Sequence, residues 1–143
     1  MTRLRLLMCF ALAWVVSVPV LAQRPESLYK AGARAESKGK FDVAYEAYKE
    51  AHEKKPSDTK YLSAYLKARL YASAQHIQAG QSLRDVDKLQ DALVEFRRAA
   101  EIDVSNFAAF QEIRRTNDII NRREAREAAP PQRKLELLSL IHI

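Results

Sequence analysis

Small and aromatic residues recur at helical spacing in two places along the chain. Both stripes have a small residue, a ring and a second small residue at i, i+4 and i+7, and the second follows the first by 48 residues. They are Ala44, Tyr48 and Ala51, and then Ala92, Phe96 and Ala99. Such a stripe lies along one face of a helix. Its small residues let a neighbouring helix approach closely, and its ring fills the space between them. The pattern predicts two tightly packed helical hairpins.

The segments that precede the two stripes also correspond at this offset. Ala31-Gly32 matches Ala79-Gly80. A glycine inside a helix costs about 1 kcal/mol relative to alanine, so we interpret both glycines as points of close helix approach. Lys38-Gly39-Lys40 predicts the turn between the first two helices. At the corresponding place in the second copy Asp87 replaces the glycine, so the turn signal is weaker there.

The third helix is predicted to be unusually long. Lys55-Pro56-Ser57-Asp58 ends the second helix, and Ser57 or Asp58 supplies the N-cap of the third. The next segment, 59–72, contains neither glycine nor proline, and Leu62, Leu66 and Leu70 fall on one face of it. We therefore expect one helix from about Thr59 to Arg84. A separate short helix is the alternative.

A fifth amphipathic helix is predicted from Phe107 to about Ala128, capped by Asn106 or Ser105. Its apolar stripe is expected at Phe107, Phe110, Ile113 and Ile120, and this stripe would cover the open end of the hairpin stack. The arginine pairs of this helix lie mainly on the other face. Acidic residues interleave with them, so a solvated face is the preferred interpretation.

These patterns resemble the tetratricopeptide repeat, which reads W-x2-L-G-x2-Y, then A-x3-F, then P. Here the first copy reads Leu28-x2-Ala31-Gly32-x2-Ala35, Ala44-x3-Tyr48-x2-Ala51 and Pro56. The second reads His76-x2-Ala79-Gly80-x2-Leu83 and Ala92-x3-Phe96-x2-Ala99, with Val104 in place of the proline. The resemblance implies an all-α fold of two such hairpins, the second with an extended first helix. A C-terminal capping helix would complete a right-handed stack. Tandem copies would recur at 34 residues, and the longer offset here is a departure.

The resemblance also implies a binding groove. In tetratricopeptide proteins the first helix of each hairpin lines a concave groove that holds a peptide or a partner helix. The corresponding positions here are Tyr29, Ala33, Glu36, Ile77, Gln81 and Arg84. Tyr29 and Ala33 occupy two positions that are asparagine in repeats that clamp a carboxy-terminal carboxylate, which disfavours chaperone-tail binding. A protein or peptide partner is expected. The alternative is a stack that only spaces other domains.

The two ends of the chain do not belong to the helical domain. A basic start and an apolar run predict a Sec-type signal peptide over residues 1–22. The helical domain is assigned to 23–129, and a proline linker with the start of a missing domain to 130–137. Residues 138–143 read LSLIHI, which matches the translation of a transposase end used to prepare sequencing libraries. They are therefore interpreted as a non-native tail of a truncated fragment. A real apolar tail is the alternative.

Charge and composition argue against several classes of function. The net charge of +6 falls to +4 without the leader, with signs interleaved, which does not suggest nucleic-acid binding. The chain from Gln23 has no cysteine. We expect no catalytic residues, cofactor or metal. His52, near a helix end, is interpreted as a surface residue, and His76 as a residue that packs against the partner helix.

The arrangement as a whole resembles the amino-terminal part of bacterial secretin-type proteins of type II secretion or pilus assembly. That resemblance implies a periplasmic interaction module joined to an oligomeric outer-membrane gate through a missing C-terminal region. Membrane association would come only through that region. One alternative is a free-standing periplasmic scaffold for envelope assembly. The other is the non-catalytic front end of an enzyme whose catalytic domain is missing.

Overall fold

The computed structural model of the protein describes residues 24–129, and the predicted leader, linker and tail lie outside this range. Five helices follow one another: α1 (Pro25–Glu36), α2 (Phe41–Lys54), α3 (Thr59–Asp85), α4 (Leu89–Ile102) and α5 (Phe107–Ala128). The described part of the chain contains no strand. The prediction of an all-α fold with two hairpins and a further C-terminal helix is confirmed.

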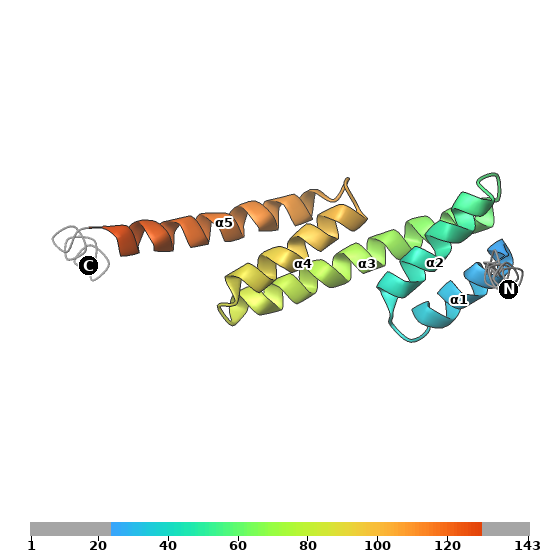
Figure 1. Ribbon diagram of the computed structural model, residues 1–143, viewed down its shortest axis with the longest axis horizontal. Helices are drawn as coiled ribbons and strands as arrows, with labels where there is room; N and C mark the ends of the chain where they lie inside the picture. The colour runs from blue at the N-terminus through green and yellow to red at the C-terminus, as the bar shows by residue number, and fades with distance from the viewer. Residues whose placement is uncertain (1–23, 130–143) are drawn as a thin grey trace, which may run out of the picture.

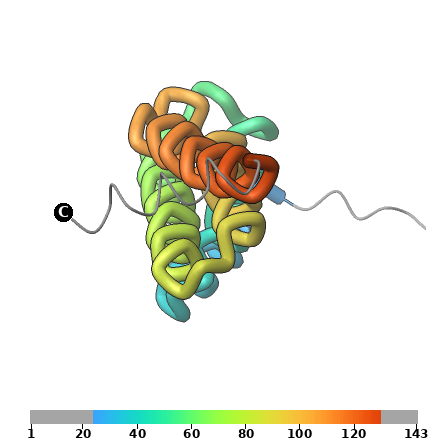
Figure 2. Tube along the Cα trace, turned by 90° about the vertical axis from the view of Figure 1, so that its left-hand side faces the viewer, coloured from blue at the N-terminus to red at the C-terminus, as the bar shows by residue number. Residues whose placement is uncertain are grey.

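The helices form an elongated stack (Figure 1). Helices α1 and α2 pair at one end, α3 runs along the length of the molecule, and α4 returns against the second half of α3. Helix α5 lies beside the α3–α4 pair, which the end-on view also shows (Figure 2). No helix of the described residues is long and apolar enough to cross a membrane.

The long helix α3 takes part in both hairpin layers. At 27 residues it is about 40 Å long. In its first half Ala68 and Ala72 are completely buried, in one cluster with Tyr45 and Tyr48 of α2. In its second half Gly80 packs against α4. The predicted extension is therefore one continuous helix, and it moves the second hairpin along the stack relative to the first.

The two inter-helix turns have the same backbone geometry although their central residues differ. Gly39 has φ 69° and Asp87 has φ 65°, so both adopt the left-handed conformation. In each turn the next amide donates to a carbonyl five residues back, Lys40 N to Ala35 O at 3.0 Å and Lys88 N to Leu83 O at 2.9 Å. This is the hydrogen bond of a Schellman motif. Aspartate is among the few residues with a side chain that enter this region, so the 48-residue repeat holds at the turn too.

Side chains cap the helices that follow the two hairpins. Asp58 Oδ1 accepts from Lys60 N at 3.1 Å and caps α3. Asn106 Oδ1 accepts from Ala109 N at 3.3 Å and caps α5. Each cap satisfies an amide that has no partner inside its helix.

The prediction of the apolar stripe on α5 is wrong for its first two residues. Phe107 is 72% exposed and Phe110 is 48% exposed. The side of α5 that faces the stack carries Ala109 and Thr116, both completely buried and seven residues apart, together with the expected Ile113. Ala109 packs with Ala99 and Ala100, and this small-residue contact brings α5 close to α4. Phe107 lies two residues before Ala109, about 200° around the helix, and so points to solvent.

Helix α5 also extends past the hairpin that it caps. Its last residues, from Asn121 to Ala128, are all exposed. In Figure 1 this part continues beyond the turn between α3 and α4. Arg123 fixes the start of the overhang, because its guanidinium donates to both oxygens of Asp87 at 2.8 and 2.5 Å.

Candidate protein-interaction surface

The two helical glycines lie under the aromatic rings of the repeat stripes. A β-carbon on Gly32 would lie 2.8 Å from the Tyr48 ring, and one on Gly80 would lie 2.5 Å from the Phe96 ring. Both rings are almost completely buried. The small residues at Ala44, Ala51, Ala92 and Ala99 have no exposed surface. Ala79 is half-buried, and Ala31 and Pro56 are exposed.

The first three residues of the candidate groove stand on α1, and two of them contact the first turns of α3. The Tyr29 ring centroid is 5.4 Å from that of Tyr48 and 5.7 Å from that of Tyr61. The Glu36 carboxylate accepts from the Tyr48 hydroxyl at 2.9 Å and forms an ion pair with Lys67 at 2.6 Å. These contacts join α1 to α2 and α3. Ala33 is exposed.

Hydrogen bonding shifts the titration of the groups in this first cluster. The Lys67 ammonium, and then the Tyr48 hydroxyl, lower the pKa of Glu36, while burial opposes them. Burial and the Glu36 carboxylate raise the pKa of the Tyr48 hydroxyl. Both shifts favour an ionised Glu36 beside a neutral tyrosine at neutral pH.

The other three groove residues lie against α5. Gln81 Nε2 donates to Glu112 Oε1 at 2.9 Å, and Arg84 forms an ion pair with the other oxygen of the same carboxylate. The Arg84 hydrogen bond, with that of Gln81, holds the pKa of Glu112 below its usual value despite burial. Ile77 packs against the alanine cluster that contains Ala109. This set therefore anchors α5 to α3.

The structure does not bring the two halves of the candidate groove together. Tyr29 and Glu36 meet the first turns of α3, whereas Ile77, Gln81 and Arg84 stand on its last turns, facing α5. The inserted residues of α3 separate the two sets along the helix. Peptide binding at these six residues stays a prediction, and five of the six already make contacts inside the chain.

His76 links the two hairpins. Its Nδ1 lies 2.6 Å from Glu95 Oε2 of α4, and its Nε2 lies 3.0 Å from Asp42 Oδ2 of α2. His76 packs against the partner helix α4, as the sequence predicted, and its side chain is only 17% exposed. His52 is half-buried, with its ring stacked 5.8 Å from that of Tyr65. Within residues 24–129 no group of three or more His, Cys, Asp or Glu is arranged to hold a metal ion.

An apolar strip on α3 remains uncovered by any helix of the described chain. Leu66 is 38% exposed and Leu70 is 58% exposed, while Leu62, one turn earlier, is half-buried. Their four-residue spacing places them on one face. We call these three residues the α3 strip. The sequence placed the leucines on one face, but nothing in their spacing indicated that this face points to solvent.

The face of α3 that carries the α3 strip continues toward the C-terminal end of the helix, where other helices of the protein cover it. Ile77 stands about three turns beyond Leu66, on the same side of α3, and packs against the cluster formed by Ala99 and Ala100 of α4 and Ala109 of α5. Ser73 joins this side of α3 to the end of α4 and the start of α5, since its hydroxyl accepts from Asn106 Nδ2 at 2.8 Å and donates to Ala99 O at 3.0 Å. Because α5 begins there, it does not cover Leu66 and Leu70 on the earlier turns of α3.

Comparison with known proteins gives structural likenesses only. No protein-family model and no curated protein matches the chain. Among solved structures, the first TPR of Spaghetti (RPAP3) bound to the HSP90 peptide SRMEEVD is 20% identical, with a TM-score of 0.33. The first TPR domain of human RPAP3 is also 20% identical, with a TM-score of 0.35. In both cases the match covers 73% of this chain and 98% of the other.

Proposed function

We propose that this chain is an exported, non-enzymatic protein-interaction module, and that its α3 strip binds an amphipathic helix of a partner protein. The observation that carries the proposal is the exposure of Leu66 and Leu70 on a face that α5 covers further along. A helix is the expected occupant because this face already receives one at Ile77. An amphipathic helix would meet the strip with apolar residues spaced by three or four.

Burial of the α3 strip would contribute part of the binding free energy. Burying a leucine side chain completely contributes about 1.5–3 kcal/mol, and roughly half of each exposed leucine surface is available here. The exposed Val104 and Phe107 stand beside the anchoring Asn106, at the end of the strip where Ser73 is bound. They would extend the apolar surface that the partner helix covers.

Site-specific photocrosslinking tests this surface in cells of the native host. A crosslinking residue would replace Leu66 or Leu70 in the full chain, with Val86 as the control. Val86 is 64% exposed but lies at the far end of α3. We expect both strip positions to trap the same protein, one that the Val86 position does not trap. Leu66→Ser with Leu70→Ser should abolish copurification of that protein. The same crosslinks from Val86 would disprove the surface.

We further propose a periplasmic location at the front of a secretin-like secretion or pilus component. The support is the leader pattern of residues 1–22, the proline linker and the resemblance of the arrangement. A native gene sequence read past the codon for Leu137, from DNA prepared without a transposase, tests this. A frame that continues into small α/β domains and a β-rich region would support the secretin-like proposal. A stop codon after Ile143 would replace it with a free-standing scaffold.

A further inference from the structure

The first hairpin carries an open groove on its outer side. The groove has a volume of about 440 Å³, and all the residues that line it come from α1 and α2. Its apolar part is formed by Leu28, Ala31, Val43 and Ala47. Val43 is 57% exposed. Tyr45 faces α3, where its ring meets that of Tyr65. Val43 lies two residues before Tyr45 on α2, and Ala47 lies two residues after it. They therefore point away from the rest of the stack. We call this the α2 groove.

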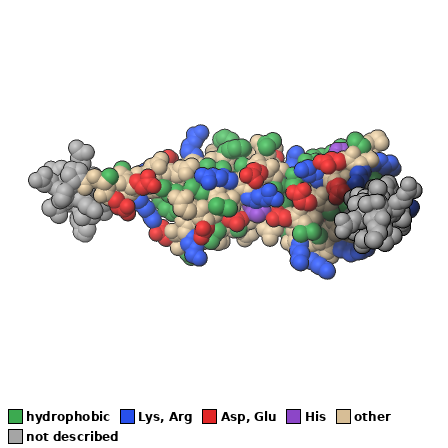
Figure 3. Space-filling model, viewed as in Figure 1, with side chains coloured by type: hydrophobic (Ala, Val, Ile, Leu, Met, Phe, Trp, Pro, Cys, Tyr) green, Lys and Arg blue, Asp and Glu red, His purple; other side chains and the backbone are tan. Residues whose placement is uncertain are grey.

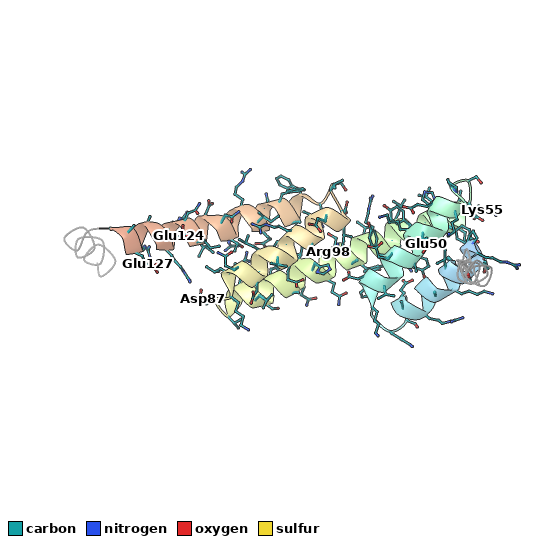
Figure 4. All side chains as sticks on the ribbon, viewed as in Figure 1. Glu50, Lys55, Asp87, Arg98, Glu124 and Glu127 are labelled. Carbon is teal, nitrogen blue, oxygen red and sulfur yellow. The ribbon has the colours of Figure 1, made fainter. Side chains whose placement is uncertain are left out.

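The rim of the α2 groove is acidic. Glu46, Glu50 and Glu53 line it, with Lys49 as the one cation among the lining residues. Glu53 has no ion pair within the described residues, and Glu50 pairs only with Lys54 of its own helix. Glu46 has one long contact, 3.8 Å from Arg98 of α4, and both side chains are about half exposed. Figure 3 shows acidic side chains over α2 on the side turned to the viewer, and Figure 4 labels Glu50 there. The groove thus offers apolar surface beside negative charge.

The opposite end of the stack carries the reverse charge. An open hollow of about 490 Å³ on the outer side of α5 is lined by Gln111, Arg114, Arg115, Asp118, Ile119 and Arg122. The two exposed rings, Phe107 and Phe110, precede it on the same helix. We call these residues together the α5 outer face. It is the face that the sequence interpretation treated as merely solvated.

The ion pairs of the structure explain why this face is more basic than the sequence suggested. Glu112 is turned inward and bound by Arg84, so it does not neutralise the outer arginines. Within residues 24–129 neither Arg114, Arg115 nor Arg122 forms an ion pair. Asp118 is the only acidic residue that lines the hollow. The α5 outer face therefore presents uncompensated positive charge beside apolar rings.

We propose that the α5 outer face of one copy binds the α2 groove of a second copy, head to tail. The two surfaces are complementary in charge, and both combine charge with exposed apolar groups. Their spacing also agrees. Arg115 and Arg122 are seven residues apart, as are Glu46 and Glu53, which is about 10.5 Å along a helix in both cases. Two ion pairs can therefore form at once, with Glu46 exchanging its 3.8 Å contact with Arg98 for one with the second copy.

The positions of the two surfaces determine the kind of assembly. They lie at opposite ends of the elongated stack (Figure 1), so a chain cannot bring its own two surfaces together. When two copies bind in this way, one α2 groove and one α5 outer face of the dimer stay free and can bind further copies. Such heterologous contacts build rings where the rotation closes and filaments where it does not.

Charge reversal tests the proposal in the full chain purified after export. One variant carries Glu46→Lys with Glu53→Lys, and the other carries Arg115→Glu with Arg122→Glu. Light scattering after size exclusion, over a range of protein concentrations, should show the parent chain growing in mass at low salt and dissociating at high salt. Each variant alone should associate at least ~10-fold more weakly. An equal mixture of the two variants should associate more strongly than either variant alone, because the surface that each variant keeps intact matches the intact surface of the other.

The matched control is Arg34→Glu with Arg97→Glu, which changes net charge as the α5 variant does. Both arginines are exposed and line neither surface. Far-ultraviolet circular dichroism confirms that each variant folds. The control should associate like the parent chain. A parent chain that stays monomeric at every concentration would overturn the proposal. So would association that both charge-reversed variants retain, since it would use another surface.

Discussion

The ring of Phe96 lies only 2.5 Å from the place that a β-carbon on Gly80 would occupy, and Tyr48 has the same relation to Gly32 at 2.8 Å. Real β-carbons do not approach other atoms this closely. In each hairpin the ring therefore fills the volume that the glycine leaves empty. This pairing sets how closely the two helices of a hairpin approach.

Gly80→Ala should destabilise the protein although alanine favours a helix by about 1 kcal/mol. The added methyl group meets a completely buried ring, and overpacking of this kind costs about 1–3 kcal/mol. Urea unfolding measures the difference in the free energy of unfolding. Combining Gly80→Ala with Phe96→Leu should cost less than the two single changes added together, because the smaller side chain makes room. A Gly80→Ala protein as stable as the parent would contradict this packing.

Ala44→Leu and Ala92→Leu should each cost about 1–3 kcal/mol. Both alanines have no exposed surface and stand in the small–ring–small stripes. Ala74→Leu is the control, because Ala74 is exposed on α3. Thermal unfolding should show a clear decrease in Tm for both buried positions and little change for the control. Unchanged unfolding in both would disprove the repeat assignment.

Glu112→Gln should weaken the attachment of α5 to α3 by about 1–2 kcal/mol at neutral pH. The pKa of Glu112 is lowered below its usual 4.5, chiefly by the Arg84 hydrogen bond. A lowered folded-state pKa means that the carboxylate stabilises the fold at pH values above 4.5. That contribution disappears as the pH falls through the lower, folded-state pKa. The stability gap between the parent and the variant should therefore be steady from pH 7 to about 5 and then narrow.

Glu127→Gln provides the comparison for this measurement. Glu127 lies on the exposed overhang of α5 (Figure 4). It makes no ion pair within the described residues. Its substitution should change stability by less than about 0.5 kcal/mol. A gap for Glu112→Gln that stays constant down to pH 3 would show that the ionised form contributes nothing.

Asp87→Gly should be more stable than Asp87→Ala by about 1 kcal/mol. Both substitutions remove the exposed ion pair with Arg123, so its loss cancels in the comparison. Only the backbone preference then differs, because φ at this position is 65° and glycine adopts it without strain. Chemical denaturation of the two variants gives the difference. Equal stabilities would mean that the turn relaxes out of the left-handed conformation.

The sequence by itself determined the helices of this protein. Proline, glycine and capping residues act within a few positions of one another, so Pro56 and Asp58 mark the start of α3 without any knowledge of its neighbours. The 48-residue repeat and the absence of a breaker after Thr59 indicated one long helix in the same way. These effects depend only on residues close together in the chain, so they can be predicted from the sequence alone.

Tertiary structure alone decided which faces are buried. On α5 the pattern favoured the large side chains, yet contact with Ala99 and Ala100 selected Ala109 and left Phe107 exposed. Glu112 and Arg115 look alike as members of a mixed-charge run, but only Glu112 meets Arg84 across the packed interface. Burial and ion pairing depend on residues distant in the sequence. The α3 strip and the two end surfaces therefore became visible only once the helices were packed together.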